Sequence, residues 1–428
     1  MKLADDERAM LDGQRGKACQ KAMELLVRYA EALDCERLID TTNVAGVPGS
    51  TTPFLANYYR DFPGGADKVF SYFDLDSDEL VDVPHVVTQS CHLQAGYDPE
   101  NWETLGATPE QASLSLSSER YAVDRGIKIL KTCTPYLAGN IPKLGEHCAW
   151  MESSAVIYCN SVLGARTNTE GRESTSAAML TGKIPEFGLH VDLNRRGTHE
   201  VVVDATTRSV MDWGMLGYFV GDAVQEHIPV LTGIDVAPDP IRYKHFGAAA
   251  ASSGGVEMYH IIGATPEAFS RDAAFGSRAP VEEIHYGAAE RRATYENLNA
   301  NGSDTNVDYV MLGCPHAALE QIVEACKLLD GKRISPNCRL WIFTSRAVRQ
   351  QADASGYTDV IRRAGGFLLT DTCSAIGQAL PPGTKVAALD SAKQVHYLPA
   401  IMGIEAWFGS TADCINASLT GRWTGDLR

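Results

Sequence analysis

The chain has 428 residues, of which 44% are hydrophobic and 21% are charged, and its formal net charge is -16. This length exceeds what one compact core usually takes, so two or three lobes are expected. The acidic balance excludes a general nucleic-acid binder, because such proteins need a surplus of Lys and Arg to neutralise phosphates.

The first residues show no signal-peptide pattern, since Asp5, Asp6 and Glu7 stand where a basic and then apolar stretch would be required. No later apolar run approaches the roughly 20 residues of a membrane helix. We therefore expect a cytoplasmic protein with no membrane partner. The eleven cysteines are an odd number and include no C-x-x-C pair. A closed disulfide framework is not expected, and any metal site must be assembled from distant loops.

The chain opens with a predicted helical segment over residues 5–38. Apolar residues recur there at helical spacing, at Ala22, Leu25, Leu26, Tyr29 and Leu33. A stretch rich in Gly, Thr and Pro follows over residues 41–53, which predicts either a surface loop or a ligand-binding loop.

One unit then recurs four times: an apolar strand that ends in a loop of small, polar or cysteine residues. The four strands cover residues 127–131, 309–312, 367–370 and 385–389. The loops that follow them hold Cys133, Cys314, Cys373 and Lys393. Between Cys314 and Cys373, strands alternate with helices, which predicts an α/β fold with a parallel, doubly wound sheet.

In such sheets, ligands bind outside the carboxyl ends of the strands, where Cys314, Ser345, Cys373 and Lys393 are expected to meet. We divide the chain into an N-terminal α/β lobe over residues 1–125, a central lobe over 126–300 and a C-terminal lobe over 301–428. The central lobe would carry Cys133, the first of three candidate cluster cysteines, and a candidate substrate loop over residues 152–171. The C-terminal lobe would carry the other two cluster cysteines.

Cys133, Cys314 and Cys373 are the candidate metal ligands. Pro315 is a residue favoured at the first turn of a helix, so Cys314 is predicted to lie near a helix amino terminus that stabilises its thiolate. Hydroxyl groups flank the other two cysteines and can donate to cluster sulfurs. Cys19, Cys159 and Cys326 fall on predicted helices and are expected to be core residues. Cys35, Cys91, Cys148, Cys338 and Cys414 receive no ligand role.

A polar stretch over residues 152–171 is the candidate substrate loop, although a helix cap and a surface turn would explain the same polarity. Arg166 is the first choice for binding a carboxylate, because its guanidinium offers a bidentate fork. The full set of predicted substrate-binding residues is Ser153, Ser154, Asn160, Ser161, Arg166, Thr167, Asn168 and Lys393.

Three thiolates on a cubane cluster leave one iron open, and that iron can act as a Lewis acid toward a hydroxyl group. Elimination of water from a hydroxy acid needs this acid, a base for the carbon-bound proton, and cations or amides for the carboxylate. No convincing base is found in the chain. Ser153, Ser154 and His316 are candidates, and each is explained more simply as a hydrogen-bonding residue.

Six segments together resemble the signature segments of aconitase X. They cover residues 133–137, 149–156, 160–168, 313–316, 371–373 and 391–397. The resemblance runs in order over nearly the whole chain. It implies an aconitase-like fold of several parallel doubly wound sheets with helices on both faces, and an iron-sulfur cluster on Cys133, Cys314 and Cys373. The cluster type, 4Fe-4S or 2Fe-2S, stays open. It also implies reversible dehydration of a hydroxylated small molecule.

Members of this family carry a small swivelling domain on the same chain or as a separate subunit, and the serine thought to act as base belongs to that part. No such domain is found through Arg428, so the resemblance implies a heterodimer with a small subunit that completes the site. Two activities are known in the family: dehydration of cis-3-hydroxy-L-proline, and dehydration of mevalonate 5-phosphate.

We favour cis-3-hydroxy-L-proline. The proteins of the second type resemble one another around a Thr-Thr-x-Asn-Pro segment before the first cluster loop, whereas residues 87–92 read Val-Thr-Gln-Ser-Cys-His here. Another hydroxy acid is a further alternative. Two other classes stay open as well: a non-catalytic binding subunit with packing cysteines, and a cysteine-dependent hydrolase or transferase that uses Cys314 with His316.

Overall fold

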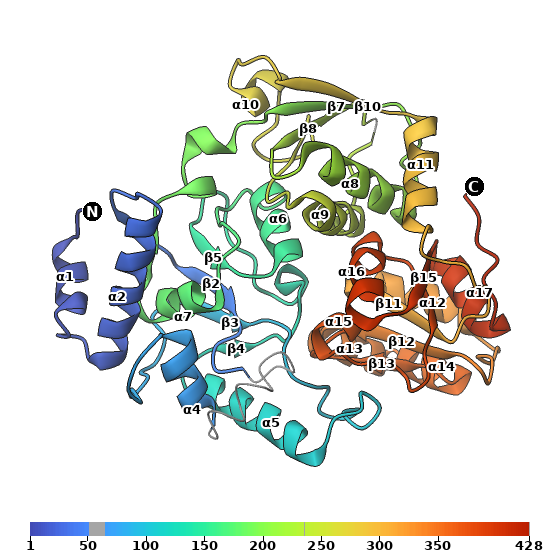
Figure 1. Ribbon diagram of the computed structural model, residues 1–428, viewed down its shortest axis with the longest axis horizontal. Helices are drawn as coiled ribbons and strands as arrows, with labels where there is room; N and C mark the ends of the chain where they lie inside the picture. The colour runs from blue at the N-terminus through green and yellow to red at the C-terminus, as the bar shows by residue number, and fades with distance from the viewer. Residues whose placement is uncertain (51–64, 235, 428) are drawn as a thin grey trace.

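The computed structural model describes residues 1–50, 65–234 and 236–427, and it contains three parallel sheets, each flanked by helices (Figure 1). The predicted α/β class with several parallel sheets is therefore confirmed. We call each sheet with its helices the first, second or third unit, in chain order. Among the helices of the described ranges, none has the length and apolar character needed to cross a membrane.

The first unit has the strand order β4-β3-β2-β5, with all strands parallel. Its strands are β2 (Asn43–Gly46), β3 (Gln89–His92), β4 (Lys128–Ile129) and β5 (Cys148–Trp150). Its helices are α1 (Asp5–Leu11), α2 (Lys17–Ala32), α4 (Ala66–Lys68), the π-helix η2 (Val69–Asp74), α5 (Pro109–Val123), the 3-10 helix η3 (Pro135–Leu137), α6 (Ser153–Ser161) and α7 (Arg172–Thr181). A separate antiparallel pair joins β1 (Leu38–Asp40) to β6 (Lys183–Pro185).

The helical segment predicted over residues 5–38 is confirmed as α1 and α2 up to Ala32, because the apolar side of α2 is buried through Ala22, Leu25 and Leu26; Leu38 already belongs to β1. The predicted loop over residues 41–53 is wrong in part. Asn43–Gly46 is strand β2, which is buried in the middle of the first sheet. Residues 51–53 lie outside the described residues.

The second unit has the strand order β10-β7-β8-β9, again all parallel. Its strands are β7 (His199–Val203), β8 (Pro229–Thr232), β9 (His260–Ile261) and β10 (Glu282–Tyr286). Its helices are η4 (Gly188–His190), η5 (Asp192–Arg195), α8 (Val210–Val224), α9 (Pro240–Gly254), α10 (Arg271–Phe275) and α11 (Ala288–Leu298). Helices α8 and α9 pack closely because Gly217 has no side chain: a Cβ there would lie 2.2 Å from the Phe246 carbonyl oxygen.

The third unit has the strand order β13-β12-β11-β14-β15, all parallel. Its strands are β11 (Tyr309–Ala317), β12 (Arg339–Thr344), β13 (Phe367–Leu369), β14 (Val386–Leu389) and β15 (Glu405–Phe408). Its helices are α12 (Leu319–Leu329), α13 (Arg346–Ala354), α14 (Tyr357–Ala364), α15 (Ser374–Gly377), α16 (Ala392–Met402) and α17 (Thr411–Thr420).

The strand order changes direction once in each of the three sheets; in the second, the chain builds β7, β8 and β9 and then places β10 on the other side of β7. In the third sheet the chain builds β11, β12 and β13 toward one edge and then places β14 on the other side of β11. In the first sheet it builds β2, β3 and β4 and then places β5 on the other side of β2. Such switch points open a crevice between the loops at the carboxyl ends of the two central strands.

The first sheet continues past residue 125, the boundary that the sequence placed between the first two lobes. Strands β4 and β5 lie beyond that residue and pair with β3 and β2. The loop that carries Cys133 therefore leaves the first sheet. One apolar core includes residues of both the first and second units, among them Trp150, Ile157, Phe246 and Tyr259. The division into three lobes at residues 125 and 300 stays a prediction.

Candidate active site

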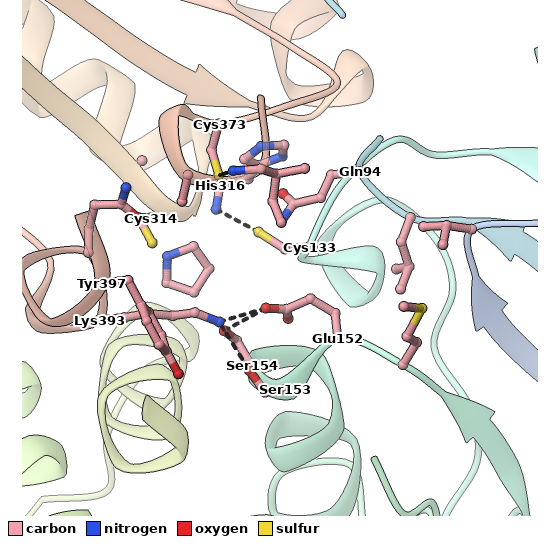
Figure 2. Close-up of a pocket in the computed structure, with 18 of the residues that line it drawn as sticks. Gln94, Cys133, Glu152, Ser153, Ser154, Cys314, His316, Cys373, Lys393 and Tyr397 are labelled. Atoms are coloured by element: carbon pink, nitrogen blue, oxygen red, sulfur yellow. Dashed lines mark hydrogen bonds and ion pairs between the residues drawn. The ribbon is translucent and has the colours of Figure 1, made fainter. Parts of the chain in front are cut away.

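A cavity of about 540 Å³ lies where the switch-point loops of the first and third sheets face each other. Its polar and sulfur-containing lining comes from both units. The first unit supplies Gln94, Cys133, Glu152, Ser153, Ser154 and Arg172, and the third unit supplies Cys314, His316, Cys373, Lys393 and Gln394. Figure 2 shows the three cysteines toward one side of this cavity, with Lys393 and Glu152 facing each other on another.

Each of the three cysteines has a residue with a left-handed backbone one or two positions before it. The φ angles are 47° at Lys131, 89° at Gly313 and 71° at Asp371. Such a residue turns the chain sharply, so each cysteine leaves the line of its strand. Gly313 cannot be replaced without movement, because a Cβ there would lie 2.1 Å from the Phe343 carbonyl oxygen.

Buried polar contacts hold the two strained non-glycine residues. The ammonium of Lys131 donates to the Ala95 carbonyl at 2.9 Å. Asp371 accepts a bond of 2.8 Å from Nε of Arg346, and the same guanidinium binds Glu119 of α5 at 2.6 Å. Arg346 therefore ties the loop of Cys373 in the third unit to a helix of the first unit.

The prediction that Cys314 lies at a helix amino terminus is wrong. Cys314 belongs to β11, the peptide bond to Pro315 is cis, and α12 begins only at Leu319. The pairing of β11 with β12 is interrupted between Leu312 and Ala317, so the segment with Cys314 bulges out of the sheet. Cys373, in contrast, does cap a helix: its sulfur accepts from the backbone N–H of Ile376 in α15 at 3.5 Å.

The three thiols are buried, and their burial outweighs the stabilisation that Lys393 gives to a thiolate. Burial raises the pKa of Cys314 to about 12, and it also raises the pKa values of Cys133 and Cys373. The nearby Lys393 opposes this rise at all three sites. Loss of the three thiol protons inside this cavity thus requires a further positive group, which bound iron would supply.

The donor set fits a cluster better than a single ion. Among the residues that the structure describes, no three His, Cys, Asp or Glu side chains are close enough together to hold one metal ion. Three cysteines on separate segments around one cavity would suit a polynuclear iron-sulfur group, which their thiolates would hold. The backbone N–H of His316 donates to the Cys133 sulfur at 3.2 Å, the type of contact that tunes cluster sulfurs. All eleven cysteines are free and buried.

His316 is neither a base nor the partner of Cys314. Its Nε2 lies 2.9 Å from the Thr372 carbonyl and must donate to it, so Nδ1 accepts from the Thr132 hydroxyl at 2.9 Å. Burial is the main cause that lowers the pKa of His316 to about 4, which keeps the ring neutral. Both ring nitrogens are occupied, and the geometry therefore disfavours the alternative of a Cys314–His316 dyad.

Lys393 is the central cation of the cavity. Its ammonium donates to Glu152 Oε1 at 2.6 Å, to Ser154 Oγ at 2.6 Å and to Ser153 Oγ at 3.2 Å. Burial disfavours the charge, but Glu152 and Cys314 outweigh it and raise the pKa of Lys393 above its usual value. Lys393 is consequently a fixed positive charge at neutral pH and cannot serve as a base.

A second buried lysine, Lys244 of α9, stands behind the cysteine segment. It donates to the carbonyls of Pro315 and His316 at 3.3 and 2.9 Å and to the side-chain oxygen of Gln321 at 2.5 Å. These contacts satisfy carbonyl groups that the bulge removes from the sheet ladder. Lys244 thereby links the second unit to the segment that carries Cys314.

The structure brings together six of the residues that the sequence singled out for the site. Cys133, Cys314, Cys373, Ser153, Ser154 and Lys393 all line the cavity. Glu152, Gln94, Arg172 and Gln394 also line it, and the sequence analysis assigned them no role. Gln94 lies just past the end of β3, so the rule on strand ends could have found it. Arg172, at the start of a helix, carries no such signal.

Five of the predicted substrate-binding residues do not line the cavity. Their polar atoms instead bind groups of the protein, within the first unit for Asn160 and Thr167, and between the first and second units for Asn160 as well as for Ser161, Arg166 and Asn168. Asn160 accepts from the Thr167 backbone N–H at 2.9 Å, and Arg166 donates to the His190 carbonyl at 3.1 Å and pairs with Asp192. Ser161, Thr167 and Asn168 accept from backbone N–H groups of Tyr259, Trp150 and Leu189. The expectation that Arg166 binds the substrate carboxylate is therefore not supported, because its guanidinium is used structurally.

Three family models match the chain in order: the aconitase X first domain over residues 1–193, the second domain over 197–296 and the third domain over 307–420. The phosphomevalonate dehydratase large subunit of Methanothermobacter thermautotrophicus is 37% identical over 94% of each chain. The cis-3-hydroxy-L-proline dehydratase of Pseudomonas aeruginosa is 32% identical over 97% of this chain and 70% of its own length.

A solved structure of similar shape is the holo-form of aconitase X from Thermococcus kodakaraensis. It has a TM-score of 0.82 and 30% identity, and the match covers 98% of this chain and all of that one. Both groups of curated relatives are dehydratases, so they share one reaction class, the removal of water. The chain belongs to the aconitase X family and is a hydro-lyase of that family.

Proposed function

We propose that this chain is the large subunit of an iron-sulfur-dependent dehydratase that removes water from cis-3-hydroxy-L-proline. A small swivelling subunit would complete the site and supply the base. The observation that carries the proposal is the cavity in which three cysteines from three separate segments near strand ends face the Lys393–Glu152 pair. The fold and the dehydratase relatives support it, since they include large subunits.

Cys133, Cys314 and Cys373 would hold the cluster. When bound, the cluster would supply a Lewis-acidic iron that favours departure of the substrate hydroxyl group. Lys393 would stabilise the negative charge that develops as the carbon–oxygen bond breaks, because its own charge is fixed by Glu152. Ser153 and Ser154 hold the ammonium in place.

The proton bound to carbon must leave to a base. Three ionisable residues of the described lining are not suited to take it: His316 is neutral with both nitrogens occupied, Lys393 stays protonated, and Glu152 is held by Lys393 and by the Ala155 N–H at 2.9 Å. This arrangement supports the proposal that the base comes from the small subunit, which would also cover the cavity and exclude water.

Charge supports the choice of substrate. The two cations of the described lining each face a carboxylate: Lys393 faces Glu152, and Arg172 faces Asp74. The cysteine thiolates would add negative charge when they bind iron. A zwitterion with no net charge, such as hydroxyproline, suits such a cavity better than mevalonate 5-phosphate, which brings a carboxylate and a phosphate.

Dehydration of mevalonate 5-phosphate is the second candidate. The observation in its favour is the 37% identity to the phosphomevalonate dehydratase large subunit, against 32% to the cis-3-hydroxy-L-proline dehydratase.

The test is anaerobic co-expression with an aconitase X small subunit from the same organism, followed by iron and sulfide analysis, electron paramagnetic resonance and turnover assays. We expect iron and sulfide to be bound and cis-3-hydroxy-L-proline to be consumed in preference to mevalonate 5-phosphate. Preference for the phosphate would establish the second candidate. Absence of iron and sulfide after anaerobic handling would overturn the cluster proposal.

A further inference from the structure

Two glutamine side chains of the cavity are buried with an amide group left unused. Gln94, just past β3, is 8% exposed, and Gln394 of α16 is 2% exposed. Both line the cavity. Among the residues that the structure describes, Oε1 of Gln94 and Nε2 of Gln394 find no hydrogen-bond partner. An unused polar group costs about 1–3 kcal/mol when buried, so each position needs an explanation.

A third buried glutamine nearby shows the ordinary outcome. Oε1 of Gln321 accepts from Lys244 at 2.5 Å and from the Ala318 N–H at 3.2 Å, and its Nε2 lies 3.0 Å from His245. Gln321 does not line the cavity, and the fold satisfies both ends of its amide. The two glutamines with an unused group are those that line the cavity, where a ligand can complete them.

The charged side chains of the cavity have few hydrogen-bonding positions free for the charged groups of a substrate. Lys393 and Arg172 are held by Glu152 and Asp74, so they offer charge but few free positions. An amide oxygen accepts from an N–H of an ammonium group, and an amide nitrogen donates to a carboxylate. Two neutral amides can thus bind both charges of a zwitterion without adding net charge. Figure 2 places Gln94 across the cavity from Lys393.

We propose that Gln94 and Gln394 recognise the amino-acid part of the substrate, Gln94 its ammonium and Gln394 its carboxylate. They would make this enzyme selective for a cyclic amino acid over the corresponding hydroxy acid without an amine. The inference rests on the proposed dehydratase function and deepens it, since it assigns selectivity to residues of the large subunit. Both glutamines are specificity-determining residues and take no part in the bond-breaking steps.

The test compares two substrates that differ in one ring atom. One is cis-3-hydroxy-L-proline, and the other is its analogue with oxygen in place of the ring nitrogen, which has no N–H to donate. Both are assayed with the complex of large and small subunits carrying the Gln94→Leu, Gln94→Glu or Gln394→Leu substitution. Gln351→Leu, at an exposed position of α13, is the matched control. Iron content and Tm are measured for every variant.

Gln94→Leu should raise KM for cis-3-hydroxy-L-proline about 10- to 100-fold, the effect of losing a hydrogen bond to a charged group, and should change KM for the oxygen analogue less than about threefold. Gln94→Glu should restore KM toward the parent value, because a carboxylate also accepts from an ammonium. Gln394→Leu should raise KM for both substrates, since both keep the carboxylate. Gln351→Leu should change neither.

Equal effects of Gln94→Leu on the two substrates, or no effect on either, in an active complex would overturn the inference and leave the proposed function standing. A parent complex that consumes only mevalonate 5-phosphate would overturn both the substrate proposal and this inference, while the hydro-lyase class stands. If the parent complex consumes neither cis-3-hydroxy-L-proline nor mevalonate 5-phosphate, its affinities for L-proline and for tetrahydrofuran-2-carboxylate, measured by calorimetry, test the inference. Equal binding of these two, or none, by the parent complex overturns the inference.

Discussion

The wall of the cavity and the nearby loop over residues 160–168 are both rich in polar side chains, yet they use them in opposite ways. In the loop, Asn160, Ser161 and Thr167 bind backbone groups of the first and second units, and Arg166 uses its terminal nitrogens in the same way, although its Nε finds no partner among the described residues. In the cavity wall, Gln94 and Gln394 keep unused amide groups. Density of polar residues thus marks both structure and function, and an unused buried group points to a binding site where it also lines a cavity, as in Gln94 and Gln394.

The largest effect on activity is expected from replacing a cysteine of the cavity. Cys314→Ser should remove the cluster and lower kcat by at least about 10³-fold, since several kcal/mol of transition-state stabilisation depend on the metal. Iron analysis and turnover of the two-subunit complex measure it. Cys326→Ser is the control, because Cys326 is buried in α12 and its sulfur lies against the Tyr357 carbonyl. Retention of iron by Cys314→Ser would remove this residue from the ligand set.

The next largest difference in kcat is expected between variants of the two cations that were predicted from the sequence to bind the substrate, Lys393 and Arg166. Lys393→Met should lower kcat about 10²- to 10³-fold with a small change in Tm, because it removes a fixed charge from the site of reaction. Arg166→Met should leave kcat within about threefold and destabilise the fold by about 1–3 kcal/mol, because it leaves the His190 carbonyl without its donor. Steady-state kinetics and thermal unfolding of both variants test the comparison. A large loss of kcat in Arg166→Met would show that the loop over residues 160–168 belongs to the active site.

The smallest effect concerns Glu170, which follows the loop and is 3% exposed. Burial is the main cause that raises the pKa of Glu170 to about 7. Between pH 4.5, the ordinary pKa of a glutamate in the unfolded chain, and pH 7, Glu170 therefore keeps a proton in the folded chain that it releases in the unfolded chain. Stability falls as pH rises through this window. Glu170→Gln should gain up to about 3 kcal/mol over the parent at pH 8 and almost nothing at pH 4.5.

Urea unfolding at the two pH values measures the difference between the Glu170→Gln variant and the parent. The exposed neighbour Glu173, replaced by Gln, serves as control and should show no gain at pH 8. A Glu170→Gln gain that is the same at both pH values would mean that burial of the charge is not its cause. Neither variant should alter kcat, since Glu170 does not line the cavity.

Much of the fold followed from local pattern. Alternation of apolar strands and helices predicted parallel α/β units, and the rule on strand ends correctly brought Cys314, Cys373 and Lys393 to one cavity. Ser345, expected beside them, does not line the cavity, because its hydroxyl caps α13 by accepting from the Val348 N–H at 3.2 Å. The helix expected at Pro315 was wrong because β11 bulges and resumes its pairing at Ala317, a feature of sheet register that a short sequence pattern does not reveal. Arg166 was chosen for its chemistry alone, without knowledge of its partners.

The sequence by itself determined the strand-end positions of the cysteines, because a run of apolar residues followed by a polar loop is a local signal. It also determined the family, through segments spread over nearly the whole chain. Only the tertiary structure decided which polar groups are free. Arg166 meets Asp192 and the His190 carbonyl, whereas Gln94 meets no partner for its oxygen. Hydrogen-bond satisfaction depends on residues distant in the chain, and no local pattern records it.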